Sequence, residues 1–275
     1  MWSVNTVLGK FFDFLFLPFR SLNPWAGMVF ISLLTGLLML FIYRLTSNQA
    51  GIRQVKDRIK AHLLELRLYK DNMSVTMKAQ GKILSANLKY IVLNFRPLLV
   101  MIVPLILILA QLNLWFGSSP LEVGKPAIFK LKLAPNARPL DMEFVLKAPP
   151  QIAVETPPLR LEELNEVDWR INPGSPGIYH LAVETGGKSF RKTVVVGGRP
   201  LQKVSSLKVQ RNVLNEILYP GEKPLPGGDP VRSMELLYPG ARLRLLGLRV
   251  HWLIAYLALS IIFGFALKKP FKVEI

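Results

Sequence analysis

The few polar residues that could do chemistry in this sequence lie inside or beside apolar segments. Gln111 and Asn113 follow Pro104 in a stretch without charge, and Arg44 ends another such stretch. Amides and guanidiniums in lipid need polar partners, so they usually face a bundle interior or a wet cavity. Gln111 and Asn113 are therefore either contacts between helices or contacts for a substrate. Arg44 is either an anchor at the membrane interface or a charge in a groove between helices. Pro104 predicts a helix kink.

No arrangement of side chains in the sequence is typical of catalysis. His62, His180 and His251 are far apart in the chain, and no pair has the spacing of metal ligands. Residues 186–189 (GGKS) imitate the end of a phosphate-binding loop, but the required first glycine is Ala182. We therefore expect no enzyme activity, no metal site and no cofactor.

The composition is both basic and apolar. The 275 residues include 35 Lys+Arg, 18 Asp+Glu and no cysteine, and 51% are hydrophobic. This apolar content excludes disorder of the whole chain, and the lack of cysteine excludes a disulfide scaffold. Three runs carry no charge and are about as long as a membrane-spanning helix. They predict spans at 24–44, 97–117 and 250–267, although each could also be a buried core helix.

The charge distribution predicts the orientation of these spans. The segment that starts at Arg44 and ends at Arg96 holds 11 Lys/Arg and 3 Asp/Glu, and the tail 268–275 holds 3 Lys and 1 Glu. Short basic segments stay in the cytoplasm. We therefore expect a multi-pass protein of the cell (inner) membrane, with 45–96 and the tail inside. Residues 1–20, as an interfacial amphipathic helix, and 118–249 are expected outside.

The cytoplasmic segment 45–96 reads as an antiparallel helical hairpin. Two apolar stripes have helical spacing: Ile52, Val55, Ile59, Leu63 and Leu66, then Met77, Leu84, Leu88, Ile91 and Phe95. Mutual packing of the stripes is the plain interpretation. The basic outer faces either fix the topology or dock ribosomal RNA, anionic headgroups or a nascent chain.

The external segment divides into two parts. Residues 118–198 contain short alternating runs, with Gly186-Gly187 as a hairpin turn, and predict an all-β sandwich. Trp169 and the run 176–179 (PGIY) resemble, weakly, the core pattern of immunoglobulin-like domains. Residues 199–249 are rich in Pro and Gly, and apolar residues such as Met234 and Leu236 alternate with basic ones. We expect this part to form a membrane-proximal collar against the outer leaflet.

The predicted fold class is thus a three-span α-helical membrane core with a cytoplasmic hairpin and an extracytoplasmic β-sandwich. This order resembles the YidC/Oxa/Alb insertase superfamily, and it is similar to the archaeal members and the third subunit of the ER membrane protein complex. The resemblance rests on residues 12–18 (FDFLFLP), Tyr43-Arg44, residues 103–107 (VPLIL) and residues 111–116 (QLNLWF).

The resemblance implies a polar groove among three spans that receives nascent or small membrane proteins without ATP. It implies that Arg44 is the groove cation and that Gln111 and Asn113 are the polar lining. A ribosome or a membrane-complex subunit could bind the hairpin, and the lipid bilayer surrounds the core. The alternative is a structural or interaction protein, whose core is an anchor and whose residues 118–198 bind an envelope protein.

Overall fold

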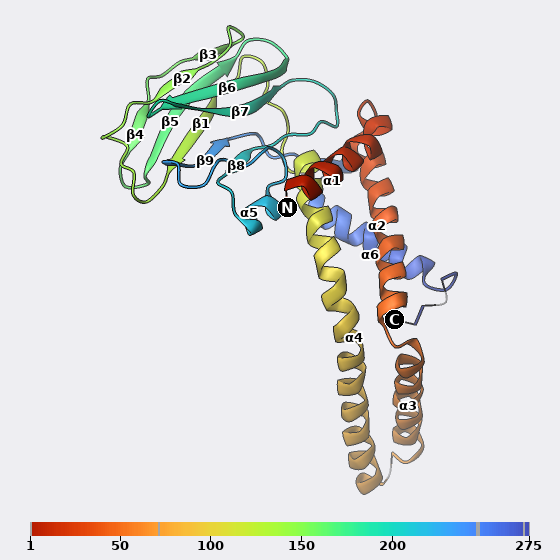
Figure 1. The fold of residues 1–275 in the computed structure, drawn as a ribbon. Helices are drawn as coiled ribbons and strands as arrows, with labels where there is room; N and C mark the ends of the chain where they lie inside the picture. Colours follow the sequence, from red (N-terminus) through yellow and green to blue (C-terminus); the bar gives the residue numbers. More distant parts are fainter. Residues whose placement is uncertain (1, 71, 246–247, 272, 275) are drawn as a thin grey trace. The chain divides into compact units, whose positions relative to one another are not determined.

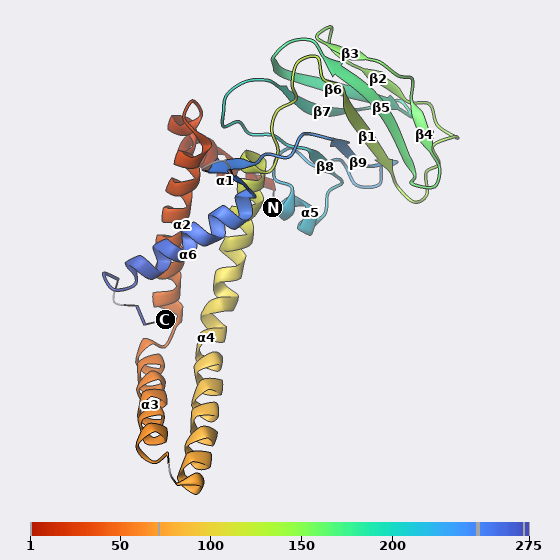
Figure 2. The ribbon, with the colours of Figure 1, turned by 180° about the vertical axis from the view of Figure 1, so that it is seen from behind.

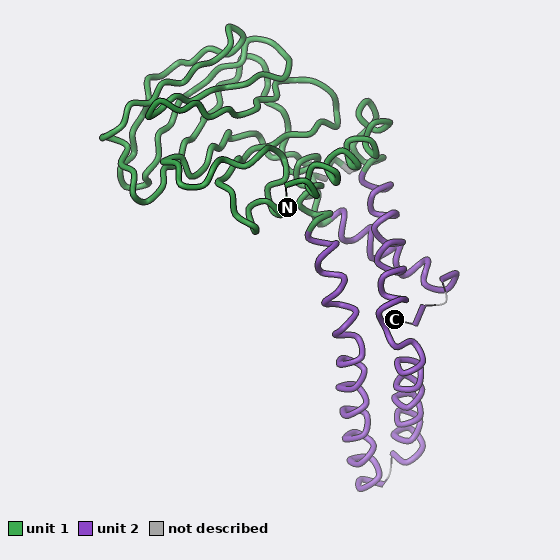
Figure 3. Tube along the Cα trace, viewed as in Figure 1, with its two compact units in different colours: residues 1–27, 107–254 green, residues 28–106, 255–275 purple. Residues whose placement is uncertain are grey.

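The computed structural model describes residues 2–70, 72–245, 248–271 and 273–274. The chain forms two compact units, which are coloured separately in Figure 3. Unit 1 comprises residues 1–27 and 107–254, and unit 2 comprises residues 28–106 and 255–275. Each unit is described below by itself.

Unit 2 is helical, and its helices are labelled in Figure 1. They are α2 (Pro24–Thr46), α3 (Gln49–Leu68), α4 (Met73–Phe116) and α6 (Trp252–Leu267); the first turn of α2, the end of α4 and the start of α6 belong to unit 1. By length and composition, α2 and α4 are apolar enough to cross a membrane, whereas α6 is apolar but has 16 residues. The described residues therefore contain two helices of spanning length and one shorter apolar helix.

Helix α4 joins two elements that the sequence analysis treated as separate. It runs unbroken for 44 residues through Pro97 and Pro104, so the second hairpin helix and the apolar run after it are one helix. Asn48 is the N-cap of helix α3: its side chain accepts a hydrogen bond from the Gly51 N–H at 2.9 Å. Lys82 and Glu65 pair across the hairpin at 3.6 Å.

The hairpin does not pack through both predicted stripes. On α3, Ile52 and Val55 are buried as expected, although Leu63 is exposed. On α4, the whole predicted stripe from Met77 to Phe95 is exposed, and the fully buried residue is Ala79. A neighbouring face with two alanines, Ala79 and Ala86, is covered instead, since small side chains let the helices approach closely. The prediction of mutual packing was wrong for the α4 stripe.

The C-terminal segment lies against the start of α3 in unit 2. The Glu274 N–H donates to Gln49 Oε1 at 2.7 Å, and the Glu274 carboxylate pairs with Lys56 at 3.0 Å. Val273 is buried in a cluster with Leu40 and Ile52. Figures 1 and 2, which are opposite views, both show α6 beside α2. The end of the chain and the hairpin are thus on the same side of unit 2.

Two antiparallel sheets of unit 1 share one core. One has the order β3-β5-β1-β9-β8, with β4 also on β5, and the other has the order β2-β6-β7. Phe129 and Trp169 of the first sheet and Leu181 and Val194 of the second are buried in one cluster. The strand bounds are β1 Ala127–Leu133, β2 Val145–Lys147, β3 Ile152–Val154, β4 Leu159–Leu161, β5 Glu166–Pro173, β6 Gly177–Thr185, β7 Lys188–Val196, β8 Leu207–Val209 and β9 Val231–Leu236.

The predicted hairpin turn at Gly186-Gly187 is confirmed. Strands β6 and β7 pair from Gly177 with Val196 to Thr185 with Lys188. Gly186 and Gly187 have φ values of 54° and 72°. Positive φ at both central residues is what a two-residue type I′ hairpin requires, and glycine adopts it without steric cost.

Residues 199–249 are not a separate collar. Strands β8 and β9 complete the larger sheet, and β9 pairs with β1. Met234 and Leu236 are fully buried, because the alternation along β9 turns them into the β core rather than outward. The segment also contains α5 (Val213–Leu218) and the pair β10 (Leu243–Leu245) and β11 (Leu248–Val250); residues 246–247 lie outside the described part.

Helix α1 (Trp2–Leu15), followed by the short η1 (Leu17–Phe19), belongs to unit 1 and presents an apolar face outward. Asn5, Gly9 and Phe12 are buried, and the Asn5 side chain donates to the Glu216 carbonyl. The exposed large apolar residues of α1 recur every three or four positions: Val4, Val7, Phe11 and Phe14. This pattern fits a helix that lies on an apolar surface.

Candidate functional site

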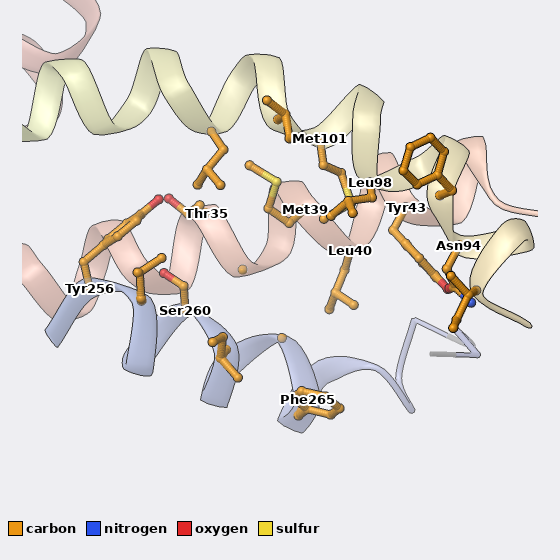
Figure 4. A pocket seen from close by; sticks show the side chains of 18 of the residues that line it. Thr35, Met39, Leu40, Tyr43, Asn94, Leu98, Met101, Tyr256, Ser260 and Phe265 are labelled. Carbon is orange, nitrogen blue, oxygen red and sulfur yellow. The ribbon is translucent and has the colours of Figure 1, made fainter. Parts of the chain in front are cut away.

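An apolar hollow of unit 2 lies among α2, α4 and α6 (Figure 4). We call it the helix groove. It has a volume of about 530 Å³ and is lined mainly by apolar side chains. Its lining residues are Thr35, Gly36, Met39, Leu40, Tyr43, Tyr90, Ile91, Asn94, Phe95, Leu98, Met101, Ile102, Leu105, Tyr256, Leu257, Ser260, Ile261, Gly264 and Phe265.

The helix groove is open rather than sealed. Phe95 and Leu98 of α4 and Ile261 and Phe265 of α6 all line it, and each is between 54% and 57% exposed. Soluble proteins rarely leave so many large apolar side chains exposed on one contiguous face. The lining is therefore suited to an apolar partner that enters from outside.

One end of the helix groove carries buried hydroxyl groups. The Tyr256 hydroxyl faces those of Thr35 and Ser260 (Figure 4). All three oxygens are shielded from solvent, and none makes a hydrogen bond of ordinary geometry to another described residue. At the other end, the Tyr43 hydroxyl donates to Asn94 Oδ1. The groove thus offers polar partners at both ends of an apolar surface.

The exposed stripe of α4 leads into this hollow. Met77, Leu84 and Leu88 are each more than half exposed, and the same helical face continues through Ile91, Phe95, Leu98 and Ile102. Those last four residues line the helix groove. The apolar face that the hairpin leaves uncovered is therefore continuous with the groove.

The residues that the sequence singled out lie elsewhere. Arg44 is exposed in the last turn of α2, and Pro104 lies inside α4. Gln111 and Asn113 are on the part of α4 that belongs to unit 1; Gln111 is 1% exposed and Asn113 is exposed. Neither polar atom of the Gln111 side chain has a hydrogen-bond partner among the described residues. The lining of the helix groove includes none of these four residues.

The three hydroxyl residues of the helix groove were not predicted from the sequence. Thr35, Tyr256 and Ser260 belong to apolar runs, and only their hydroxyl groups distinguish them from the surrounding residues. The sequence signal that could have identified them is the occurrence of hydroxyl-bearing and small residues where helices contact each other. Gly36, Gly264 and Ser260, which cluster where α2 meets α6, fit that signal.

A buried ion pair joins strand β7 to two loops of unit 1, one before β8 and one after α5. Lys192 of β7 is fully buried and donates to the Ser205 carbonyl at 2.6 Å and to Glu222. Glu222 Oε2 also accepts the Thr193 N–H at 3.0 Å. Burial lowers the pKa of Lys192, and Glu222 opposes that change. Because β7 is an edge strand, the bond from the Thr193 N–H satisfies one of its free backbone groups, which is a structural role.

Within the described ranges, His, Asp and Glu form no group of three or more that could hold a metal ion. Comparisons with known proteins do not assign the chain to a family. No protein-family model matches the chain, and no curated protein matches it.

Two solved structures of the S-layer protein SbsC are weakly similar. Domains 4 and 5 align at 15% identity with a TM-score of 0.24 over 29% of this chain, and domains 5–6 at 13% with a TM-score of 0.23 over 35%. The aligned parts cover 47% and 50% of those structures, about half their length. At these scores the likeness carries no argument about fold or function.

Proposed function

We propose that this protein is an insertase-like membrane protein, which assists the insertion or folding of small membrane proteins without ATP. The observation that supports the proposal is the open helix groove, together with the exposed α4 stripe that leads into it. An apolar client segment would contact the stripe first and then the groove. This path would give a client a continuous apolar surface from the hairpin into the helix groove.

The two polar ends of the groove suit the proposed task. A polar group that enters bare hydrocarbon loses its hydrogen bonds to water, at a cost of about 2–7 kcal/mol. The hydroxyls of Thr35, Tyr256 and Ser260 have no ordinary hydrogen bond among the described residues, so they could replace some of those bonds if their side chains turned from the shielded position toward a client. The barrier to insertion would fall without any input of chemical energy.

The proposal includes three spans and a defined orientation. Helices α2 and α4 have the required length, and the 16 residues of α6 extend about 24 Å, so α6 would be a short third span. The C-terminal segment contacts the start of α3, which agrees with placing both in the cytoplasm. In unit 1, Lys203 pairs with Asp13 at 3.1 Å, which agrees with placing the N-terminus and the β domain together outside.

We also propose that a client makes polar contacts outside the helix groove, with Arg44, Gln111 and Asn113. This role rests on the resemblance to the insertase superfamily. Arg44→Ala tests it directly, with the exposed Arg67 of α3 as the matched control. A loss of insertion in Arg44→Ala alone would support the role, and equal insertion in both variants would remove it.

Two neighbouring isoleucines of α6 allow a sharp test of the groove. Ile261 lines the groove and Ile262 does not, yet they are 57% and 59% exposed. We expect Ile261→Trp to fill the groove and slow the insertion of a small membrane protein into proteoliposomes severalfold. Ile262→Trp should insert at the normal rate. Equal rates in the two variants, or no insertion by the normal protein, would overturn the proposal.

The second candidate is a structural or interaction protein of the envelope. It is favoured by the β domain, which has a complete core of its own and exposed apolar residues such as Ile178 and Val145. A photoreactive residue in place of Ile178 in the full chain should then crosslink one external protein in cells. If that crosslink forms and Ile261→Trp leaves insertion unchanged, the second function replaces the first.

A further inference from the structure

A polar hollow in unit 1 has features that the insertase proposal does not use. It lies beside the end of α1, the end of α4 and strand β7, which Figure 1 labels, and its volume is about 590 Å³. Three cations line it: Arg20, Arg199 and Lys203. Its carboxylates are Asp13 and Glu222. We call it the unit 1 hollow.

Both carboxylates of the unit 1 hollow already have cationic partners. Asp13 accepts two bonds from Lys203, at 3.1 and 3.3 Å. Glu222 is paired with the buried Lys192 and also accepts the Thr193 N–H. The guanidiniums of Arg20 and Arg199 are therefore not neutralised by these groups, and the hollow is positive.

Two buried donors of the unit 1 hollow lack an acceptor. The Arg20 guanidinium lies over the Trp115 ring at 5.5 Å, and Trp115 is 3% exposed. Arg20 Nε and Trp115 Nε1 are both shielded from solvent, and neither has a hydrogen-bond partner among the described residues. An unpaired buried donor is unfavourable, so a small turn of the Arg20 and Trp115 side chains that exposed these nitrogens to an oxygen-rich anion in the hollow would remove that cost.

A second group of cations extends the positive surface. The adjoining hollow shares Thr193 and Glu222 with the first and is also lined by His180, Arg191, Lys208 and Lys223. Burial lowers the pKa of Lys208, and the neighbouring Lys223 lowers it further, whereas Glu222 raises it. A cleft lined by charges of one sign concentrates ions of the opposite sign.

The place of the unit 1 hollow in the fold indicates the source of the anion. Arg20 follows α1, whose exposed face carries Val4, Val7, Phe11 and Phe14. A helix with such a face lies at the level of lipid headgroups. An anion of the headgroup layer would thus be close to the guanidinium of Arg20.

We propose that the unit 1 hollow binds the phosphate of an anionic phospholipid headgroup, held by Arg20, Arg199 and the Trp115 indole N–H. Guanidiniums bind phosphate oxygens through paired, charge-assisted hydrogen bonds, and an indole N–H adds a single donor. This site would fix the β domain to the external leaflet. It shares no residue with the helix groove, and only the choice of the external leaflet rests on the orientation proposed above.

The test uses the full chain purified in mild detergent with equal amounts of phosphatidylglycerol and phosphatidylcholine. Native mass spectrometry then counts the lipids that each protein retains. We expect preferential retention of phosphatidylglycerol, and Arg199→Gln should weaken it about tenfold, since one charge-assisted contact is lost. Arg199 is exposed, so this variant should fold normally; Arg138→Gln removes an equal charge elsewhere on the β domain and should have no effect.

Inorganic phosphate and soluble glycerophosphoglycerol separate the possible sources of the anion. If both compounds displace phosphatidylglycerol, and the protein retains this lipid when neither compound is present, the result supports a headgroup site. Binding of inorganic phosphate without preferential lipid retention would overturn the lipid assignment. Equal retention of both lipids with no phosphate binding, or equal losses in Arg199→Gln and Arg138→Gln, would overturn the site itself.

Discussion

Gly36 of α2 lies against the backbone of α6 at Gly264. A Cβ atom on Gly36 would be 3.3 Å from the Gly264 nitrogen and 3.2 Å from the Ser260 carbonyl oxygen. Backbones approach this closely only where side chains are absent or small. Since Gly36 and Gly264 both line the helix groove, this contact also sets the distance between two of its walls.

The first prediction follows from this contact. Gly36→Ala should destabilise unit 2 by about 1–3 kcal/mol, because the neighbouring atoms are backbone and the added methyl group overpacks the contact. Gly264→Ala is the matched control, since a Cβ atom there meets nothing within 4 Å. Thermal unfolding in detergent measures both, and equal midpoints would contradict the close approach.

The second prediction concerns the buried amide of Gln111. Its two polar atoms have no hydrogen-bond partner in the described part of the chain. Gln111→Leu has a similar volume and removes this unsatisfied pair, so it should raise the free energy of unfolding by about 1 kcal/mol. A drop in stability would show that the amide has a partner. A rise in stability with a loss of insertion would support its proposed contact with clients.

The third prediction concerns pH and the buried Lys192. Burial lowers the pKa of this lysine below its ordinary value of 10.5, so between the two values the unfolded chain binds a proton that the folded chain releases. The free energy of unfolding should therefore rise with pH in that window and fall as pH drops through the lowered pKa. Chemical unfolding at a series of pH values below about 10.5, the ordinary pKa of lysine, measures the slope.

The double variant Lys192→Met/Glu222→Gln is the control for this slope. It removes both charges while the Gln carbonyl can still accept the Thr193 N–H, so the pH dependence should become flatter. Lys208, whose pKa burial also lowers, would supply the remaining slope. Lys192→Met alone should be far less stable, by roughly 3–5 kcal/mol, because it leaves a buried carboxylate unpaired.

The fourth prediction separates the two faces of α1. Phe12 is 2% exposed and Phe14 is 76% exposed. Phe12→Ala should destabilise unit 1 by about 3 kcal/mol through loss of core packing, whereas Phe14→Ala should leave stability unchanged. A peptide of residues 1–20 should instead bind lipid vesicles more weakly with Phe14→Ala. If Phe14→Ala also lowered stability, the exposed face would have a protein partner.

Patterns of period two predicted the β domain well. The alternation of Tyr179, Leu181 and Val183 and the double glycine after it determine the β6–β7 hairpin, because both are local signals. The same rule failed to assign β9 to the sandwich. Its partner β1 lies about a hundred residues earlier in the chain, and a sequence pattern does not encode such a pairing.

The helical hairpin shows a different limit. Met77, Leu84, Leu88, Ile91 and Phe95 have the spacing of a packed stripe, yet this face of α4 is exposed. Apolar periodicity shows which residues share a face, but it does not show whether protein, lipid or a client covers that face. For the same reason the groove residues Thr35 and Ser260 could not be distinguished from ordinary members of an apolar helix.

The order of the groove walls along the chain has a consequence for synthesis. Helices α2 and α4 leave the ribosome early, the whole β domain follows, and α6 comes last. At about 5–20 residues per second, several seconds separate the second wall of the groove from the third. A newly made copy therefore lacks one wall of the helix groove until α6 emerges, and the groove-facing sides of α2 and α4 lack that partner during the interval.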